Sequence, residues 1–258
     1  MLLTIDIGNT NITCGIYKNG TLINKYRFCS DIHADKQSYE SLFRAEFKEI
    51  QISNCIMSSV VDELTPIIRE AVEKLFLIKP FIINSNTDLG IKICSKNPEK
   101  IGTDRIINVF AAGKIHSKPA IVIDIGTATT FDIINKDGDF IGGIILSGPE
   151  TQAKALALNT SKLPQIDIKK AEFLEKTINI ETEKAMLTGI VKGHAYAIEG
   201  LIEDCIKELG SKPAIIATGG YAQLISKHLK KYKFDSISPN LTLDGLNMAF
   251  ELIRKQTI

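Results

Sequence analysis

The chain has 258 residues, of which 44% are hydrophobic and 24% are charged, as in an ordinary folded protein. This composition excludes a disordered chain, a collagen-like repeat and a disulfide-rich scaffold. Thirty-one Lys and Arg residues against 30 Asp and Glu residues leave a formal net charge of +1. Because no overall positive field attracts nucleic acid or an anionic membrane, we expect neither partner, and we expect anionic ligands to be bound by local geometry.

The cysteines and the N-terminal residues favour a cytoplasmic location. Five cysteines are present and no two have CxxC spacing, so reduced thiols are the simpler account. The first apolar stretch is interrupted by Asp6 and is too short for a signal peptide. No later run approaches the roughly 20 apolar residues of a membrane span. We therefore expect a soluble, cytoplasmic protein.

Hydrophobic spacing predicts three strands at the start of the chain, followed by alternating helices and strands. The first strand ends at Asp6, and the turn Lys18-Asn19-Gly20 joins the second strand to the third. An Asn-Gly pair tolerates the positive φ of a two-residue hairpin turn. The next predicted elements are a helix, a strand, a helix and a strand, at residues 38–50, 51–59, 62–76 and 80–84.

The second half of the chain repeats this opening. At an offset of 118 residues, Asp124 aligns with Asp6 and Gly138 with Gly20, without a gap. We interpret this as two copies of one unit rather than a chance likeness of two hairpins. The later predicted elements begin with a long helical pattern at residues 181–209, which we expect three glycines, Gly189, Gly193 and Gly200, to interrupt. A buried strand at residues 214–218, a helix that opens at Gly219-Gly220 and a final helix at residues 242–256 follow.

This alternation of strands and helices predicts an α/β protein with mixed sheets. The second copy begins just after residues 117–119. We therefore expect two domains, residues 1–117 and residues 118–258.

The segment from Asp6 to Asn11 is the first candidate site. Glycine in a tight turn between two strands permits close backbone approach, so several N–H groups could bind one phosphate. Asp6 at the strand end could hold a metal, directly or through water, while Thr10 or Asn11 donates to a phosphate oxygen. The alternative is an ordinary hairpin turn, which selects the same residue types.

Two further segments follow apolar strands. Three threonines, Thr127, Thr129 and Thr130, come within seven residues of Asp124, although β-propensity alone accounts for two of them. The pair Gly219-Gly220 follows a buried strand and could offer a flat backbone surface to a purine or ribose. A helix start explains the glycine pair about as well.

The segment Gly102-Thr103-Asp104-Arg105 places a carboxylate beside a guanidinium at the start of a helical pattern. An N-capping aspartate with a solvated arginine is the simpler local interpretation. Beside two phosphate turns, a second interpretation gains weight. A kinase needs a base near the acceptor hydroxyl, which suits Asp104, and a fork-shaped cation such as Arg105 suits an anionic acceptor.

These motifs together resemble the actin-like kinase and ATPase superfamily, and within it type III pantothenate kinase. The resemblance runs from Met1 to the final helix. It implies two duplicated ribonuclease-H-like domains with mixed sheets and an interdomain nucleotide cleft. The matching motifs, in order, are Asp6 to Thr10, Gly102 to Arg105, Asp124 to Asp132 and Gly142 to Ile145.

The resemblance implies roles for single residues. Asp104 would be the catalytic base, Asp124 would bind a monovalent cation (K⁺ or NH₄⁺), and Asp6 would organise Mg²⁺, directly or through water. The ATP- and phosphate-binding residues would be Asp6, Ile7, Gly8, Asn9, Thr10, Asn11, Ile12, Thr13, Thr127, Gly219 and Gly220. The substrate-binding residues would be Gly102, Thr103, Asp104, Arg105 and Thr182. The family also implies a homodimer.

The implied function is ATP-dependent phosphorylation of pantothenate to 4′-phosphopantothenate, the first step of coenzyme A biosynthesis. Two departures from the family pattern stand out: Ser95 replaces a pocket tyrosine, and Ser147-Gly148 replaces Pro-Gly. The alternatives are a related kinase acting on another small hydroxyl substrate and a non-catalytic nucleotide-binding regulator. His194, within the long helical pattern, is expected to serve helix packing or to lie on the surface.

Overall fold

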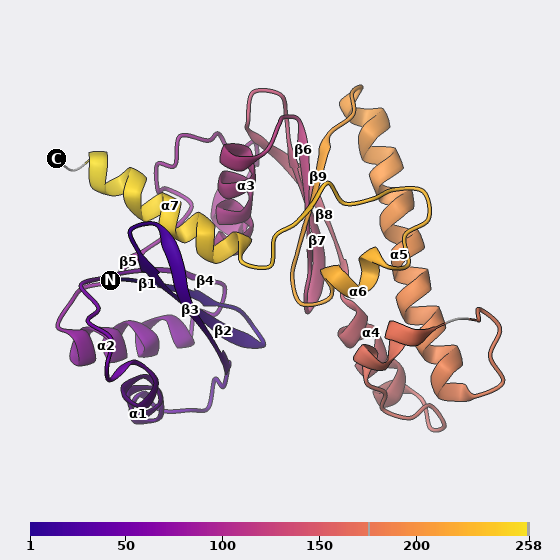
Figure 1. The fold of residues 1–258 in the computed structure, drawn as a ribbon, viewed down its shortest axis with the longest axis horizontal. Helices are drawn as coiled ribbons and strands as arrows, with labels where there is room; N and C mark the ends of the chain where they lie inside the picture. The colour runs from indigo at the N-terminus through magenta and orange to yellow at the C-terminus, as the bar shows by residue number, and fades with distance from the viewer. Residues whose placement is uncertain (175, 257–258) are drawn as a thin grey trace. The chain divides into compact units, whose positions relative to one another are not determined.

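The structure, a computed structural model, describes residues 1–174 and 176–256. The chain forms two compact units (Figure 1). The first unit contains Met1–Lys114 together with the C-terminal segment from Asn240, and the second contains Ile115–Pro239.

The first unit is built on a mixed five-stranded sheet with the order β3-β2-β1-β4-β5. β1 is antiparallel to β2 and parallel to β4. The strands are β1 (Leu2–Ile7), β2 (Asn11–Lys18), β3 (Thr21–Cys29), β4 (Asn54–Ser59) and β5 (Phe81–Ile82). The helices are α1 (Lys36–Phe47), α2 (Leu64–Phe76), α3 (Thr103–Ile115) and α7 (Leu241–Gln256), with a short 3₁₀ turn η1 (Pro98–Lys100).

Alternation along β1 gives this sheet two different faces. Leu3, Ile5 and Ile7 are fully buried in the core formed with α1 and α2. Thr4 and Asp6 point to the opposite face, where α3 and α7 pack. The apolar alternation of β1 therefore decides which face carries the Asp6 carboxylate.

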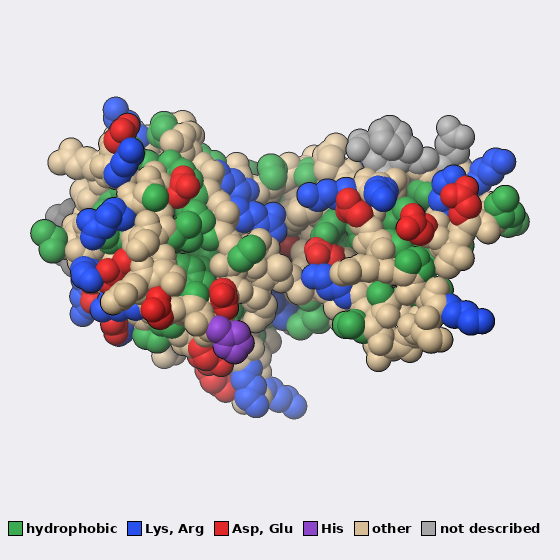
Figure 2. Space-filling view, turned by 90° about the horizontal axis from the view of Figure 1, so that it is seen from below, with side chains coloured by type: hydrophobic (Ala, Val, Ile, Leu, Met, Phe, Trp, Pro, Cys, Tyr) green, Lys and Arg blue, Asp and Glu red, His purple; other side chains and the backbone are tan. Residues whose placement is uncertain are grey.

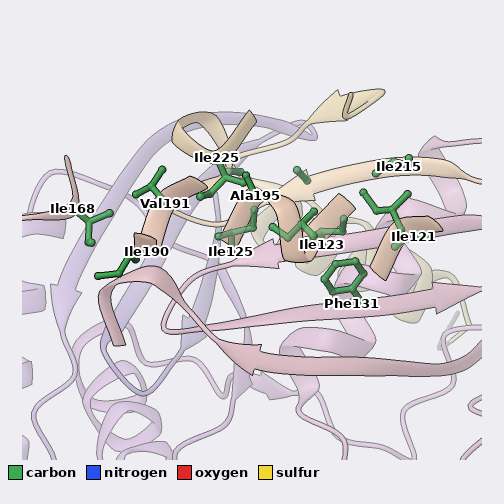
Figure 3. Packing of buried hydrophobic residues seen from close by; sticks show 14 of the residues in the cluster. Ile121, Ile123, Ile125, Phe131, Ile168, Ile190, Val191, Ala195, Ile215 and Ile225 are labelled. Carbon is green, nitrogen blue, oxygen red and sulfur yellow. The ribbon is translucent and has the colours of Figure 1, made fainter. Parts of the chain in front are cut away.

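The second unit has the order β10-β9-β6-β7-β8, again with one parallel neighbour for its first strand. Isoleucines of β6 and Phe131 of β7 pack against Val191 and Ala195 of the long helix α5 (Figure 3). The strands are β6 (Ala120–Ile125), β7 (Ala128–Ile134), β8 (Phe140–Ser147), β9 (Ala214–Thr218) and β10 (Ser236–Ile237). The helices are α4 (Pro149–Asn159), α5 (Thr182–Leu209) and α6 (Ala222–Ser226), with the 3₁₀ segment η2 (Ile168–Phe173).

The duplicated α/β architecture with mixed sheets is confirmed. β6 occupies the residues of β1 shifted by 118 at both ends, and each sheet continues with an antiparallel hairpin on one side and a parallel strand on the other. The hairpin turns differ. Asn19 and Gly20 both have positive φ, of 50° and 79°. In the longer turn of the second copy, residues 135–139, only Gly138 has positive φ, and the Asn135 side chain accepts the N–H groups of Asp137 and Asp139.

Two expectations need correction. The expected second domain, residues 118–258, included the final helix, but α7 belongs to the first unit. Leu246 and Ala249 of α7 pack with Ile107 of α3, and an amphipathic pattern alone does not indicate which core will cover it. The glycines of the long helical pattern do not interrupt it, because α5 is continuous over residues 182–209.

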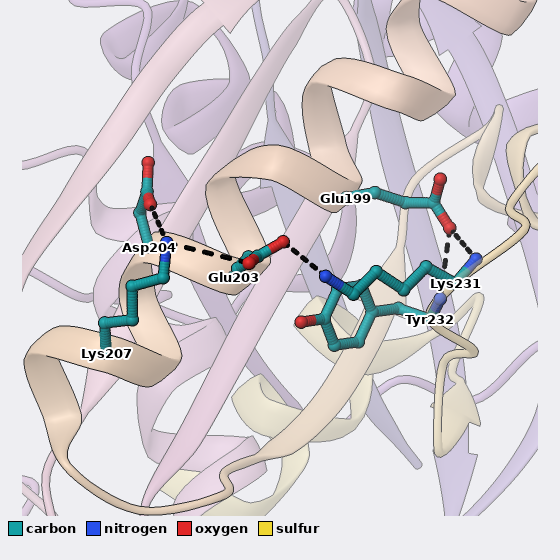
Figure 4. Close-up of polar contacts among 6 residues, drawn as sticks. All are labelled: Glu199, Glu203, Asp204, Lys207, Lys231 and Tyr232. Carbon is teal, nitrogen blue, oxygen red and sulfur yellow. Dashed lines mark hydrogen bonds and ion pairs between the residues drawn. The ribbon is translucent and has the colours of Figure 1, made fainter.

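Charged side chains of both signs are interspersed on the surface shown in Figure 2, in keeping with the net charge of +1. Glu199 of α5 accepts the backbone N–H groups of Lys231 and Tyr232, and the Lys231 ammonium lies 2.5 Å from Glu203 (Figure 4). Glu199 also accepts the backbone N–H of Lys230. These bonds fix the segment after α6 against α5. Among the described helices, none combines the length and apolar character that crossing a bilayer requires.

We predict opposite effects for two Gly→Ala substitutions in helices. A Cβ at Gly245 would lie 2.6 Å from Ile107 Cγ2 and 2.9 Å from its carbonyl oxygen, so Gly245→Ala should destabilise the protein by about 1–3 kcal/mol. At Gly200, no atom lies within 4 Å of the position that a Cβ would take, so Gly200→Ala should stabilise α5 by up to about 1 kcal/mol. Thermal unfolding measures both, and a Gly245→Ala protein as stable as the wild type would contradict the tight α3–α7 contact.

Candidate active site

The first turn, residues 8–10 between β1 and β2, is held from two sides. The Gly8 N–H donates to the Asn11 carbonyl at 3.0 Å. Ser30, just beyond β3, donates its N–H to the Thr10 carbonyl at 3.0 Å and its hydroxyl to the Gly8 carbonyl at 2.5 Å. Asn9 and Thr10 at the tip remain exposed. The turn therefore presents a fixed backbone and a polar tip, as a phosphate-binding turn requires.

Asp6 precedes this turn and has a defined orientation. The hydroxyl of Ser58, a fully buried residue of β4, donates to Asp6 Oδ1 at 2.7 Å. Among the described residues, no three or more His, Cys, Asp or Glu side chains gather into a metal site. Magnesium suits such a place, because it commonly binds one or two carboxylates and takes its other ligands from phosphates and water.

Side chains in the strand residues between Asp6 and Thr13 point alternately to the two faces of the sheet. Ile7 and Ile12 are fully buried in the core with α1 and α2, so only their backbone atoms could contact a nucleotide. Thr13 pairs with Asp6 across the β1–β2 ladder and lies on the same face. The side chains available for a ligand are therefore those of alternate residues and of the turn itself.

The start of α3 is attached to the end of β4. The Thr103 hydroxyl accepts the Ser59 N–H at 3.0 Å and donates to the Ser59 carbonyl at 2.8 Å. Ser58, the preceding residue, holds Asp6. The structure thus brings Asp6 and the segment Gly102–Arg105 to the same edge of the first sheet.

Asp104 is the second residue of α3 rather than its N-cap. Burial raises the pKa of its carboxyl, although the N–H of Arg105, 2.7 Å from Oδ1, and the Arg105 charge partly oppose this. Gly102 leaves room for this carboxylate, because a Cβ there would overlap Asp104 Oδ1. A partly desolvated carboxylate with a raised pKa is suited to accept a proton.

The second turn, residues 126–127, is held by hydrogen bonds from the start of α4. The Thr127 carbonyl accepts the Gly148 N–H at 2.9 Å and the Thr151 hydroxyl at 2.6 Å. A Cβ at Gly148 would overlap the Gly126 carbonyl oxygen. This close approach accounts for the glycine in Ser147-Gly148, the segment that departs from the family pattern.

The glycine pair after β9 lies against the second turn. Gly219 has a φ of +89°, and a Cβ there would overlap Asp124 Oδ1. Tyr221 fixes the segment, since its N–H donates to the Ile125 carbonyl at 3.0 Å and its hydroxyl to Glu150 at 2.6 Å. Asp124, Thr127, Gly219 and Gly220 are therefore neighbours within the second unit. The carboxylate and backbone oxygens of this place suit a hard cation.

Thr182, the first residue of α5, borders a cavity of about 700 Å³ between α4 and α5. The lining is mostly apolar with a few hydroxyl and amide groups, the usual character of a small-molecule site. It comprises Ser147, Thr151, Gln152, Ala155, Leu156, Leu163, Thr182, Ala185, Met186, Gly189 and Ile190.

His194 is buried in this unit and connects two of its elements. Its Nδ1 lies 3.0 Å from the Gln152 amide nitrogen, and its Nε2 lies 2.9 Å from the Thr129 hydroxyl. The same amide nitrogen donates to the Ser147 carbonyl, which fixes it as the donor, so Nδ1 accepts and Nε2 carries the proton. Burial lowers the pKa of His194 to about 4. The histidine is thus a neutral bridge from β7 to α4.

Several of these supporting residues have no role in the sequence-based interpretation. Ser30, Ser58, Ser59 and Thr151 all position a candidate site residue through hydrogen bonds. Their one common signal is a small hydroxyl side chain at the end of an apolar strand or the start of a helix. That signal is weak, because turns and caps select the same residues.

Comparison with known proteins finds one family that matches most of the chain. The sequence profile described as type III pantothenate kinase matches residues 2–204. The chain is 38% identical to the type III pantothenate kinase of Finegoldia magna, over 98% of this chain and 97% of that protein. It is 35% identical to the one of Dehalococcoides mccartyi, over 97% and 95%.

Solved structures show the same fold at low identity. The activator of the 2-hydroxyisocaproyl-CoA dehydratase from Clostridium difficile, with bound ADPNP, has a TM-score of 0.57 at 12% identity, covering 99% of this chain and 96% of that one. MreB5 of Spiroplasma citri, bound to ADP, has a TM-score of 0.55 at 13% identity, covering 99% and 98%.

The duplicated sheets, each with a hydrogen-bonded turn after its first strand, show the fold shared by actin-like ATPases and sugar kinases. Within that class the identity to curated relatives is spread over nearly the whole length. The chain belongs to the type III pantothenate kinase family.

The His194 bridge predicts an acid-sensitive stability. The unfolded chain binds a proton on this side chain near pH 6.5, but the folded protein resists protonation down to about pH 4. The free energy of unfolding should therefore fall by about 3 kcal/mol as the pH decreases through this window. Urea unfolding at several pH values should show this slope in the wild type and in the exposed control His33→Gln, and its loss in His194→Gln. An unchanged slope in His194→Gln would contradict the assignment.

Proposed function

We propose that the protein transfers the terminal phosphoryl group of ATP to the primary hydroxyl of pantothenate, forming 4′-phosphopantothenate in the first step of coenzyme A biosynthesis. The observation that carries this proposal is the joint attachment of Asp6 and of the α3 start to the serine pair Ser58-Ser59. A carboxylate suited to metal-bound phosphates and a carboxylate suited to a proton thereby share one sheet edge. Membership of the family supports the choice of substrate.

The nucleotide would be bound by backbone N–H groups and hydroxyls rather than by a basic surface. Asp6 and the exposed tip of the first turn, Asn9 and Thr10, would bind the phosphates together with magnesium. Thr127 of the second turn would contribute a further phosphate contact, with Asp124 holding K⁺ or NH₄⁺. Gly219 and Gly220 would face the adenosine. The bound cations would supply charge neutralisation for the phosphates.

The acceptor side would depend on Asp104 and Arg105. Asp104 would accept the proton of the attacking hydroxyl, and its raised pKa favours that role over one as a permanently charged group. The Arg105 guanidinium would pair with the carboxylate of pantothenate. Gly102, Thr103 and Thr182 would complete the substrate contacts. We further propose a cytoplasmic homodimer that binds neither nucleic acid nor membrane.

Ser95, which stands where the family has a pocket tyrosine, favours one second candidate. A smaller side chain leaves one wall of the acceptor site more open, so a kinase for another small hydroxyl substrate is the alternative. A panel of hydroxyl acceptors, assayed with ATP, magnesium and potassium or ammonium, separates the two. Turnover of another acceptor in preference to pantothenate would replace the proposed substrate.

Asp104→Asn should lower kcat for pantothenate phosphorylation by about 10²- to 10⁴-fold, because the amide cannot accept the hydroxyl proton. MgATP affinity should change little, because Asp104 is assigned to the acceptor. Formation of phosphopantothenate and of ADP measures the effect, with Asp137→Asn in the exposed β7–β8 turn as the matched control. Full activity of Asp104→Asn would exclude Asp104 as the base.

The raised pKa of Asp104 predicts the acidic side of the pH profile. As the pH falls, Asp104 takes up a proton earlier than an ordinary aspartate, whose pKa is about 3.9, and can no longer act as a base. The value of kcat/KM for pantothenate should therefore decline at a pH above that value. A profile that stays flat down to the ordinary aspartate range would count against this role.

A further inference from the structure

β3 is the edge strand of the first sheet, and its packing fixes the direction of Arg27. Tyr26 and Phe28 on either side point into the core with α1. The Tyr26 ring meets Phe47 edge-on at 4.9 Å, and Phe28 lies 5.6 Å from Phe43. Because neighbouring residues of a strand face opposite ways, Arg27 points to the face that carries Asp6.

Strand register places Arg27 in one row with Asp6. Arg27 pairs with Thr13 of β2, Thr13 with Asp6 of β1, and Asp6 with Ser58 of β4. Directly paired residues share a face, so a cation, a hydroxyl, a carboxylate and a second hydroxyl follow one another across four strands. With strands about 4.8 Å apart, the backbone of Arg27 is about 10 Å from that of Asp6, a span that the long arginine side chain largely covers.

The surroundings leave the Arg27 guanidinium available. The side chain is exposed, and no described residue forms a hydrogen bond or ion pair with it. Lys25, two residues earlier on the same face, donates instead to the Asn240 side chain at 2.8 Å. The end of β3 is fixed to the first turn by Ser30, so Arg27 is held on a strand that is itself attached to the turn.

The second copy shows that the strand itself does not require an arginine here. The corresponding row of the second sheet pairs Asp124 with Thr130 and Thr130 with Ile145. Ile145 stands 118 residues after Arg27 and is 64% exposed, also on an edge strand. Two rows with the same Asp-Thr pairing thus differ in their third member, and only the first carries a cation.

From this geometry we infer that Arg27 binds the terminal phosphates of the magnesium nucleotide at the first turn and is a further catalytic residue. The inference rests on the proposed function. Phosphoryl transfer spreads negative charge over the transferred group, and a guanidinium placed beside it stabilises that charge. A chain with a net charge of +1 needs such a cation at the site itself, because its overall field supplies none.

The test compares Arg27→Gln and Arg27→Lys with the wild type. Arg44→Gln, which removes another exposed positive charge, from α1, is the matched control. Two readouts are used: equilibrium affinity for MgATP and for MgADP, and steady-state kinetics with pantothenate. Arg27→Gln should weaken MgATP binding by at least about tenfold, as expected for a charged hydrogen bond, and should weaken MgADP binding less. It should also lower kcat, with KM for pantothenate unchanged and with partial recovery in Arg27→Lys.

Nucleotide affinity keeps this inference separate from the proposed function. If the wild type binds MgATP but phosphorylates no pantothenate, the substrate assignment fails while the affinities still decide the role of Arg27. If Arg27→Gln matches Arg44→Gln in both affinity and kcat, the inference is overturned and Arg27 is an edge-strand charge that discourages strand addition. If Arg27→Gln does not fold, the affinity and kcat of Arg27→Thr, which suits a strand and also removes the charge, decide: values equal to those of Arg44→Gln overturn the inference, and reduced values support it.

Discussion

Two consecutive serines at the end of β4 organise the candidate site of the first unit. Ser58 orients Asp6 through its hydroxyl, and the backbone of Ser59 is bonded in both directions by Thr103. This is possible because β1 and β4 are parallel, so that their carboxyl ends meet at the same edge of the sheet. The orientation of the metal-binding candidate and the start of the helix that carries Asp104 therefore depend on one strand pairing.

Burial shifts the pKa of two groups in the candidate sites, Asp104 and His194, in opposite directions. Removal from water disfavours the charged form of any side chain. For Asp104 this raises the pKa and produces a carboxylate more ready to take a proton. For His194 it lowers the pKa and keeps the ring neutral, so that one nitrogen accepts from Gln152 and the other donates to Thr129. The first group is suited to chemistry and the second to holding β7 and α4 together.

The sequence predicts those features that depend on local pattern. The first strand, which the structure ends at Ile7, one residue after the predicted end at Asp6, and its repeat as β6 both follow from the apolar alternation that surrounds a carboxylate. What could not be predicted depends on pairing between distant segments. The same alternation buries Ile7 and Ile12, yet a contiguous motif includes them among the nucleotide contacts. Ser58 is one polar residue among many until the parallel pairing of β4 places it beside Asp6.

In both copies the turn after the first strand is held at the same position of the repeat, but partly by different groups. In each copy the residue that follows the third strand donates its N–H to the turn after the first strand: Ser30 to Thr10, and Gly148 to Thr127. The two donors, Ser30 and Gly148, are 118 residues apart, which is the offset of the repeat. In the first copy the Ser30 hydroxyl also binds the Gly8 carbonyl. In the second copy the backbone approaches so closely that no side chain fits, and a hydroxyl from the next helix serves instead. The two copies therefore share the backbone hydrogen bond that holds the turn, but the side chains around each turn differ. This difference is consistent with the different nucleotide contacts proposed for the two turns.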